Sequence, residues 1–475
     1  MVSELAGRTY RPHPSFCFVA RNDKYREVFA AQFRDRVVHH LLVRELEKIW
    51  EPVFIHDSYA CRRGKGTHAA VQRLQTFMRR ATANGTRRAW FVQLDIRSFF
   101  PSIDRRLLLE LVRSRLHSEE LKWLAEVVIS HDPAEDPLRT CSRSKWLKIA
   151  PGKSLFSAPP GKGLPIGNLT SQFLANVYLN TLDQFIKHAL KAHYYVRYVD
   201  DMILVHEDRR VLEIWRDRIE EFLRSRLALD LHPTRRLIRP VSNGVDFVGY
   251  IVRPSHLLVR RRIVDRCKAA LSRHSKRVVD RQGENVILSF SADGYVQLHA
   301  TIQSYFGLFR HASSKRLCGS LFARNPWLGF LFEQRGGHLR RRWVFPGKPA
   351  NLRTQYGFFR RRFRGVILFQ VGRYLELLNR DALWASAALG MRRIPARPGF
   401  YARCWVPEMR RSLMVRRLLK TERNILIVTQ TGMPQGPLKE RVGSALLLKL
   451  ASLYSRTFGI GGKRSSQRPV SLCYP

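Results

Sequence analysis

The sequence predicts a mixed α/β (α+β) fold, because segments with the two-residue periodicity of strands alternate with longer segments that have the periodicity of helices. Residues 89–100, "AWFVQLDIRSFF", alternate and are rich in aromatic and β-branched side chains, which is typical of a strand. Residues 194–208, "YYVRYVDDMILVHED", place apolar arms on both sides of Asp200 and Asp201, as in a β-hairpin whose turn carries the aspartates. The helical pattern is strongest at 67–83, 169–190 and 211–227.

The other elements are predicted from local signals along the chain. Residues 24–50 are expected to form an extended segment that turns into an amphipathic helix. Residues 101–116 are expected to form a helix with Ser102 or Asp104 as its N-cap. The remaining expectations are a Pro- and Gly-rich loop at 151–168, a short hairpin within 244–261 and basic helices from about 255 to 330.

A change of composition near residue 340 predicts a domain boundary. Pro, Gly and Arg cluster there in "RRRWVFPGKPANLR", and a second small α/β unit is expected to follow. The expected domains are residues 1–254, 255–340 and 341–475.

The charge of the chain indicates a polyphosphate partner. The sequence has 84 Lys and Arg against 38 Asp and Glu, a formal net charge of +46, spread along the whole chain. Each basic side chain that meets a phosphate releases condensed counterions, which favours nucleic-acid binding. An anionic membrane surface is the alternative, but we expect no membrane contact, because no segment is apolar enough to span a bilayer. The seven scattered cysteines contain no CxxC pair, which suits a reducing cytoplasm and argues against zinc or disulfides.

Three aspartates indicate a metal site. Asp200 and Asp201 interrupt an apolar run, and Asp95 ends the apolar strand "FVQLD". Buried carboxylates repel one another unless cations lie between them, and hard divalent cations prefer oxygen ligands. Two such ions can hold the attacking and the leaving oxygen of a phosphoryl transfer. The alternative is that the pair lies in an ordinary surface turn.

With these residues the chain resembles a reverse transcriptase. "YVDD" is similar to the Tyr-x-Asp-Asp box of that family, and "LDIRSFF" to the motif that supplies its first metal-binding aspartate. The resemblance implies two Mg²⁺ ions, with Mn²⁺ as an alternative, held by Asp95, Asp200, Asp201 and the backbone carbonyl of Ile96. It also implies that Phe100 lies under the sugar and excludes a 2′-hydroxyl. The alternative for Phe100 is a core aromatic, as is expected for one of Phe99 and Phe100.

Two further motifs resemble the fingers of bacterial and group II intron enzymes. "REVFAAQFRDRVV" contains Arg26, and "SYACRRGKGTHAAV" contains Arg62 and Lys65 at its basic positions. The resemblance implies that these cations contact the incoming triphosphate, whose charge grows on the leaving pyrophosphate. The alternative is a solvated basic loop.

The stretch "GLPIGNLTSQFLANVYLN" distinguishes this chain from many relatives. Ile166 occupies a position where many reverse transcriptases have Gln, and Gly167 and Gln172 belong to the same motif, which contacts the nascent base pair. Ile cannot hydrogen-bond near that pair, which predicts lower fidelity. The string resembles the enzymes of diversity-generating retroelements, which copy a template RNA with errors at adenines. It also resembles phage-defence enzymes, so both roles stay open.

The next motifs resemble the primer-contacting part of the family. In "LDLHPTRRLIRPVSNGVDFVGYIV", Arg235 stands where a Lys commonly protonates the leaving pyrophosphate. Arginine holds its proton too tightly for that role, although it can stabilise charge. Phe247, Gly249 and Tyr250 match the primer grip. The basic helices after 255 match the thumb, which tracks a duplex backbone.

The C-terminal unit resembles the mismatch-recognising domain of MutS proteins. The likeness covers 367–390 and returns at 425–432 and at "GPLKER", 436–441. That family has a Phe-x-Glu motif whose Phe wedges beside a mispaired base and whose Glu bonds to it. The matching residues here are Tyr374 and Glu376, preceded by Arg373. The alternative is a basic scaffold in which Tyr374 is merely packed.

Together these resemblances imply a right-hand fingers–palm–thumb polymerase with an additional small C-terminal α/β domain. Such an enzyme is an RNA-directed DNA polymerase, a nucleotidyltransferase. Its expected partners are template RNA, an RNA–DNA hybrid, dNTPs and a small basic accessory protein, in the cytoplasm of a bacterium, an archaeon or a phage-infected host. A polymerase-like RNA-binding scaffold without catalysis is the alternative from another class.

Overall fold

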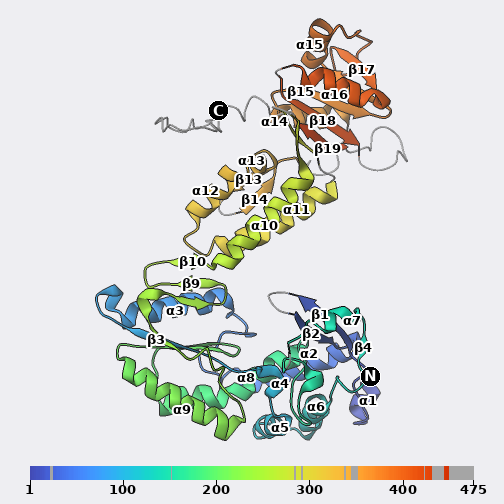
Figure 1. The fold of residues 1–475 in the computed structure, drawn as a ribbon. Coiled ribbons are helices and arrows are strands. Elements are labelled where there is room, and N and C mark those ends of the chain that lie inside the picture. Colours follow the sequence, from blue (N-terminus) through green and yellow to red (C-terminus); the bar gives the residue numbers. More distant parts are fainter. Residues whose placement is uncertain are drawn as a thin grey trace. The chain divides into compact units, whose positions relative to one another are not determined.

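The protein separates into two compact units, residues 1–260 and 261–475, which are described separately (Figure 1). The computed structural model describes residues 1–21, 25–150, 152–282, 285–289, 292–335, 338–343, 351–421, 423–430 and 443–448. The first unit extends through Arg260, because strand β10 (Leu257–Val259) completes a sheet with β9 (Tyr250–Val252) and β8 (Val245–Phe247). The second unit continues across residue 340, where a boundary was predicted.

A four-stranded antiparallel sheet forms the centre of the first unit, in the order β5-β6-β3-β7. Its apolar residues Val92, Leu94 and Leu204 are fully buried and belong to the main core. On β6 the four successive residues 202–205 are all buried, so the central strands are covered on both faces. The strands are β3 (Trp90–Asp95), β5 (Tyr195–Tyr198), β6 (Asp201–His206) and β7 (Ile238–Pro240).

Helices cover this sheet, and Figure 1 shows α9 running along one side of it. The predicted helices at 67–83, 169–190 and 211–227 are confirmed, with a π-helical turn at Phe185–Ala189 continuing the second of them. The larger helices are α2 (Phe33–Trp50), α3 (Thr67–Ala81), α5 (Arg105–Arg113), α6 (Glu119–Ser130), α8 (Leu169–Gln184) and α9 (Arg209–Leu227).

The strand predicted at 89–100 ends earlier than expected. Strand β3 stops at Asp95, and Ser98 takes a left-handed conformation (φ 47°) that starts the short helix α4 (Phe99–Ser102). Of the two predicted N-caps, Asp104 is the one observed, since its carboxylate accepts a hydrogen bond from the Leu107 amide at the start of α5.

A second, small sheet of the first unit lies in the order β2-β1-β4 and carries the basic N-terminal motif. Its central pairing is an antiparallel hairpin between β1 and β2, followed by α2 as the sequence predicted. The elements of this region are α1 (Val2–Ala6), β1 (Phe16–Arg21), β2 (Tyr25–Ala30), β4 (Leu138–Arg139) and α7 (Arg143–Trp146).

The second unit begins with the predicted basic helices; one β-hairpin interrupts them, and a second follows the last of these helices. Both hairpins were missed, because their strands are only four residues long and their charged residues resemble exposed helix positions. The elements are α10 (Arg261–Val278), β11 (Val279–Gln282), β12 (Asn285–Leu288), α11 (Ala292–Phe309), α12 (Lys315–Arg324), α13 (Trp327–Leu331), β13 (Phe332–Arg335) and β14 (His338–Arg341).

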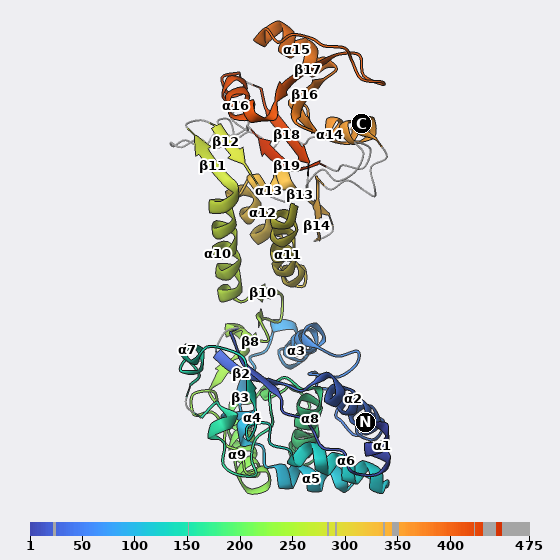
Figure 2. The ribbon, with the colours of Figure 1, turned by 90° about the vertical axis from the view of Figure 1, so that its right-hand side faces the viewer.

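The predicted C-terminal α/β part is a five-stranded mixed sheet in the order β17-β16-β15-β18-β19. Figure 2 shows α16 and α14 flanking this sheet. Alternate residues of β15 face the two sides: Leu368 packs in the core, whereas Phe369 contacts Phe359 of α14, with ring centroids 5.9 Å apart. The elements are α14 (Leu352–Arg362), β15 (Val366–Val371), β16 (Tyr374–Leu378), α15 (Arg380–Leu389), β17 (Arg403–Pro407), α16 (Arg411–Leu419), β18 (Ile425–Gln430) and β19 (Gly443–Leu448).

Candidate active site

The three predicted aspartates meet at one edge of the central sheet. Asp95 ends β3 and pairs directly with Asp201, the first residue of β6, so the two side chains project from the same face. Asp200 lies in the two-residue turn between β5 and β6. The other turn residue, Val199, has φ 55°, a left-handed conformation that is rare for a β-branched side chain. Asp200 therefore follows a strained turn residue, and Asp201 begins the strand after it.

Burial and mutual repulsion raise the pKa values of Asp200 and Asp201. Loss of hydration raises the pKa of Asp200 to about 6, and the negative charge of Asp95 acts in the same direction. Loss of hydration also raises the pKa of Asp201 to about 7, with Asp200 and Asp95 adding repulsion. Such a group of carboxylates binds protons or cations strongly, as a metal site requires.

Two of the predicted arginines lie beside these carboxylates. Arg235 forms an ion pair with Asp95, with 3.2 Å between its Nη1 and Oδ2. Arg235 and Arg26 both lower the pKa of Asp200 through their positive charge, against the larger effect of burial. Both side chains are exposed, so their charge is also accessible to a phosphate.

Gln93 is a site residue that the sequence analysis missed. Its Nε2 donates hydrogen bonds to Asp201 Oδ1 at 2.9 Å and to the Asp246 carbonyl at 3.0 Å. The bond to Asp201 stabilises the charged carboxylate and lowers its pKa. The available signal was its position two residues before Asp95, which puts both side chains on one face of the strand.

The carboxylates of Asp95, Asp200 and Asp201 suit Mg²⁺ or Mn²⁺, although they do not surround an ion on all sides. Carboxylate oxygens are the ligands that these ions prefer, and Mg²⁺ usually completes its octahedron with water and substrate phosphates. Among the residues that the structure describes, no group of three His, Cys, Asp or Glu side chains forms a ready metal cage. Arg235 takes one oxygen of Asp95 in this arrangement, so a metal ion would compete with that guanidinium.

The role of the Ile96 carbonyl as a metal ligand stays a prediction, and the structure shows how the backbone around Ile96 is paired. Ile96 bridges Leu231, and the flanking bonds run from the His232 amide to the Asp95 carbonyl and from the Arg97 amide to the Asp230 carbonyl. Successive carbonyls of an extended chain point in opposite directions, so the Ile96 carbonyl points away from this segment.

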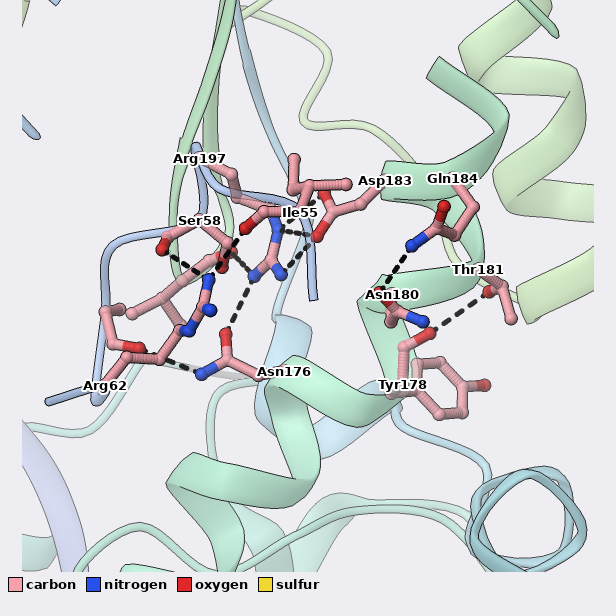
Figure 3. Close-up of polar contacts among 12 residues, drawn as sticks. Ile55, Ser58, Arg62, Asn176, Tyr178, Asn180, Thr181, Asp183, Gln184 and Arg197 are labelled. Atoms are coloured by element: carbon pink, nitrogen blue, oxygen red, sulfur yellow. Dashed lines mark hydrogen bonds and ion pairs between the residues drawn. The ribbon is translucent and has the colours of Figure 1, made fainter. Parts of the chain in front are cut away.

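A buried ion pair lies next to the turn that carries Asp200, and Figure 3 shows its two side chains. Arg197 of β5 is 1% exposed and forms a two-point pair with Asp183 of α8, which is 0% exposed. The same guanidinium donates to Asn176 Oδ1 and to the Val199 carbonyl, both at 3.0 Å. Arg197 therefore ties helix α8 to the strained residue that precedes Asp200. The sequence analysis did not select any of these three polar residues.

Arg62 and Lys65, the second pair of predicted triphosphate contacts, are engaged within the fold. The Arg62 side chain is 6% exposed, pairs with Glu51 and donates to the Ile55 and Ser58 carbonyls (Figure 3). Lys65 donates to the His56 carbonyl at 2.9 Å. Triphosphate binding by Arg62 would therefore require these internal bonds to break.

Gly167 is needed for packing of its motif on the small sheet. It has φ 126°, and a Cβ there would lie 2.7 Å from the Phe29 carbonyl oxygen and 2.7 Å from a Val28 methyl group. The preceding carbonyl, of Ile166, accepts a hydrogen bond from the Phe29 amide at 2.8 Å. Gln172 is exposed on α8 and accepts from the Cys61 thiol at 3.2 Å.

The two predicted aromatic pairs, Phe99 with Phe100 and Phe247 with Tyr250, differ in how deeply their side chains are buried. Phe99 is 3% exposed and belongs to the core, whereas Phe100 is half-buried and packs against the same core. Phe247 and Tyr250 are both buried, so only the hairpin between them, with Gly249 at φ 97°, can present backbone to a primer. These positions are consistent with the predicted roles and do not test them.

The predicted C-terminal contacts are only partly accessible. Tyr374 is 40% exposed and Arg373 is exposed at the turn between β15 and β16. Glu376 is 0% exposed and forms ion pairs with Arg397 and Arg403. Its carboxylate is therefore occupied and cannot bond to a base as the MutS likeness predicts. The "GPLKER" part of that likeness lies outside the described residues.

An antiparallel sheet with three converging carboxylates and adjacent arginines defines the palm of a nucleotidyl-transferring polymerase. Residues 14–252 match the family model described as "Reverse transcriptase (RNA-dependent DNA polymerase)". The chain therefore belongs to the reverse transcriptase family, and by class it is an RNA-directed DNA polymerase. The right-hand polymerase fold predicted from the sequence is confirmed.

Curated relatives are similar over about half of the chain. Protein YkfC of Escherichia coli (strain K12) is 25% identical over 296 residues, which cover 54% of this chain and 70% of that protein. The group II intron-encoded protein LtrA of Lactococcus lactis subsp. cremoris is 24% identical over 318 residues, 53% of this chain and 49% of LtrA. Among solved structures, apo telomerase from Candida tropicalis has a TM-score of 0.41 and 10% identity, covering 68% of this chain and 61% of that one.

None of the described helices has the length and apolar character needed to cross a membrane.

Proposed function

We propose that the protein extends a primer 3′-hydroxyl with dNTPs on an RNA template, using two Mg²⁺ ions. The observation that carries this proposal is the cross-strand pair of Asp95 and Asp201 beside Asp200, with the pKa values of Asp200 and Asp201 raised to about 6 and about 7. Family membership supports the same chemistry.

Asp95, Asp200, Asp201 and the Ile96 carbonyl would hold the metal ions. When bound, Mg²⁺ would neutralise phosphate charge and favour ionisation of the primer hydroxyl. The new bond forms between that hydroxyl oxygen and the α-phosphorus, and the bond to pyrophosphate breaks.

The remaining side chains would position Asp201 and neutralise the charge of the triphosphate. Gln93 fixes the orientation of Asp201 through its 2.9 Å hydrogen bond. Arg235 and Arg26 attract the triphosphate, and Arg235 stabilises the leaving pyrophosphate by charge, since a guanidinium is a poor proton donor. Phe100 would exclude ribonucleotides, and the hairpin at Gly249 would hold the primer end.

Single-nucleotide incorporation on an RNA template tests the proposal. Wild-type protein should extend the primer with Mg²⁺ and stop when the metal is chelated, and Asp200→Asn should abolish incorporation. Asp217→Asn is the matched control, because Asp217 is an exposed helical aspartate paired only with its neighbour Arg216 among the described ion pairs. Incorporation by Asp200→Asn at the wild-type rate would refute the assignment, and binding of RNA without any extension by the wild type would favour the scaffold alternative.

We further propose that the enzyme serves a diversity-generating retroelement and misincorporates opposite adenine. Ile166 supports this proposal, since its side chain offers no hydrogen bond near the nascent pair. Ile166→Gln should lower the error rate at template adenines, measured by sequencing the cDNA. An unchanged error spectrum would contradict this role of Ile166. Untemplated or repetitive cDNA made in cells would instead favour the phage-defence role.

A mismatch-sensing role is one candidate for the C-terminal part, and it competes with a site for unpaired strands at the same tyrosine. It rests on the exposed Tyr374 and Arg373 alone, because Glu376 is internally paired. Tyr374→Ala should weaken binding to a mismatched hybrid more than to a paired one. Equal binding of both hybrids by the wild-type protein would refute it.

A further inference from the structure

An exposed aromatic pair lies on the edge strand β17 and its neighbour β16 in the C-terminal sheet. Tyr374 of β16 and Trp405 of β17 have ring centroids 4.4 Å apart at an interplanar angle of 70°. Trp405 pairs in register with Glu376, and Tyr374, two residues before Glu376, lies on the same face of the sheet. This is the face that α14 covers at Phe369, which pairs with Glu376 on the other side. The two side chains remain 40% and 37% exposed.

The pair is held over a buried, positively charged cluster. Arg397 donates two hydrogen bonds to the Glu376 carboxylate, at 3.0 and 2.7 Å, and Arg403 forms a second ion pair with it. Two guanidiniums thus share one carboxylate and leave one positive charge beside the rings. The buried Arg403 Nε has no hydrogen-bond partner in the described part of the chain. Glu376 therefore fixes two arginines in place instead of contacting a ligand.

The charge around the pair identifies the chemistry of its partner. Arg397 is 30% exposed, and Arg373 is exposed on the turn that leads into Tyr374. Residues 351–430 contain 17 Lys or Arg against 4 Asp or Glu. A polyanion is favoured over an ordinary protein surface by this excess.

The ring geometry favours unpaired bases over a duplex. In an edge-to-face pair, one ring presents its edge to the other, so that the edge-on ring leaves both of its faces free of its partner. Bases of a duplex are stacked on their neighbours, whereas the bases of a single strand can stack on aromatic side chains.

We propose that Tyr374 and Trp405, with Arg373 and Arg397 beside them, form a site for single-stranded RNA on which bases stack. Trp405 has no part in the likeness to the mismatch-recognising domain, and the proposed ligand is an unpaired strand instead of a mispaired duplex. The site does not depend on the polymerase reaction.

Photocrosslinking of the full chain tests the site directly. Short single-stranded RNA containing 4-thiouridine is irradiated with wild-type protein, and the adducts are located by mass spectrometry. Adducts are expected on Tyr374 or Trp405. They should disappear when the same RNA is annealed to DNA, with or without a mismatch. The readout involves no nucleotide incorporation, so it succeeds or fails independently of the proposed activity.

Binding measurements supply the second arm. Tyr374→Ala/Trp405→Ala should weaken binding of single-stranded RNA about tenfold, as expected for the loss of one stacked base. The slope against log salt should stay unchanged, because no phosphate contact is removed, whereas Arg373→Gln should reduce that slope by about one. Tyr401→Ala is the matched control, since Tyr401 lies just before β17, is 67% exposed and has no ring contact with the pair among the described residues.

Three results would overturn the proposal. The first is the absence of adducts at both rings while crosslinks form elsewhere. The second is equal loss of affinity in Tyr401→Ala and the double variant. The third is a double variant with lower thermal stability but unchanged RNA affinity, which would mean that the rings only shield the Glu376 cluster. Trp405→Phe separates folding from stacking, because it keeps a ring and should retain most of the affinity.

Discussion

The buried guanidinium of Arg197 provides a test of how the turn before Asp200 is held. Arg197→Lys keeps a positive charge against Asp183 but removes the fork that reaches the Val199 carbonyl and Asn176. A hydrogen bond to a charged group contributes roughly 1.5–3 kcal/mol, so the loss of these two bonds should cost about 3 kcal/mol or more of unfolding free energy. The left-handed conformation of Val199 itself costs roughly 1–3 kcal/mol, and Arg197 opposes its release.

The expected consequence is a displaced Asp200 in a folded protein. A shift of about 1 Å at a reacting centre reduces the rate about 100-fold, so kcat for single-nucleotide incorporation should fall by about that factor. KM for the dNTP should change only a few-fold, because the arginines proposed to bind the triphosphate, Arg26 and Arg235, are separate from the ion pair. The assay is steady-state incorporation, accompanied by thermal unfolding.

Arg360→Lys is the matched control. Arg360 is a mostly buried arginine of the second unit that pairs with Asp381 and donates to the Gly365 carbonyl, both at 2.9 Å. Its replacement should lower thermal stability in a similar way and leave kcat within a few-fold of wild type. If Arg197→Lys lowers stability but keeps the wild-type kcat, Arg197 supports the fold only, and the positioning role is wrong.

Three further predictions concern the first unit, residues 1–260. Gly167→Ala should destabilise the protein by about 2 kcal/mol or more, which would be seen as a lower Tm. Gly161→Ala is the control and should lower Tm less, because a Cβ added there meets nothing within 4 Å. Equal decreases in Tm for the two variants would contradict the packing role of Gly167. The pKa values of Asp200 and Asp201 are raised to about 6 and about 7, so the metal-free fold loses stability as the pH rises from about 4 to 7. Mg²⁺ should therefore raise Tm more at pH 8 than at pH 5.5. An equal rise in Tm at both pH values would refute this linkage. Gln93→Leu removes the bond that lowers the pKa of Asp201 and should move the acidic limb of the incorporation rate to higher pH; an unmoved profile would exclude that role.

The position of the three aspartates at one sheet edge could be predicted because their signals are local. A charge that ends an apolar strand, as at Asp95, and a charged pair between apolar arms, as at Asp200 and Asp201, both identify positions at a sheet edge. The sheet register then places them together. Arg235 was also found from sequence, through its position after "HP", and the structure places it on Asp95.

The supporting contacts could not be predicted, because each depends on a distant partner. Gln93 meets Asp201 across 108 positions of sequence, and neither residue indicates the other. Arg197 looks like an exposed strand residue until the fold places Asp183 against it. Glu376 was misassigned for the same reason, since its partners Arg397 and Arg403 lie on segments that the fold brings over β16.

The central claim, that three aspartates hold two metal ions for nucleotide transfer, is tested most directly by diffraction at the manganese edge. Crystals of the protein with an RNA template, a DNA primer and an incoming dNTP would be grown with Mn²⁺. We expect two anomalous peaks roughly 3.5–4 Å apart, contacting Asp95 and the Asp200–Asp201 pair and the triphosphate. An ordered dNTP with no anomalous peak at these carboxylates would contradict the account.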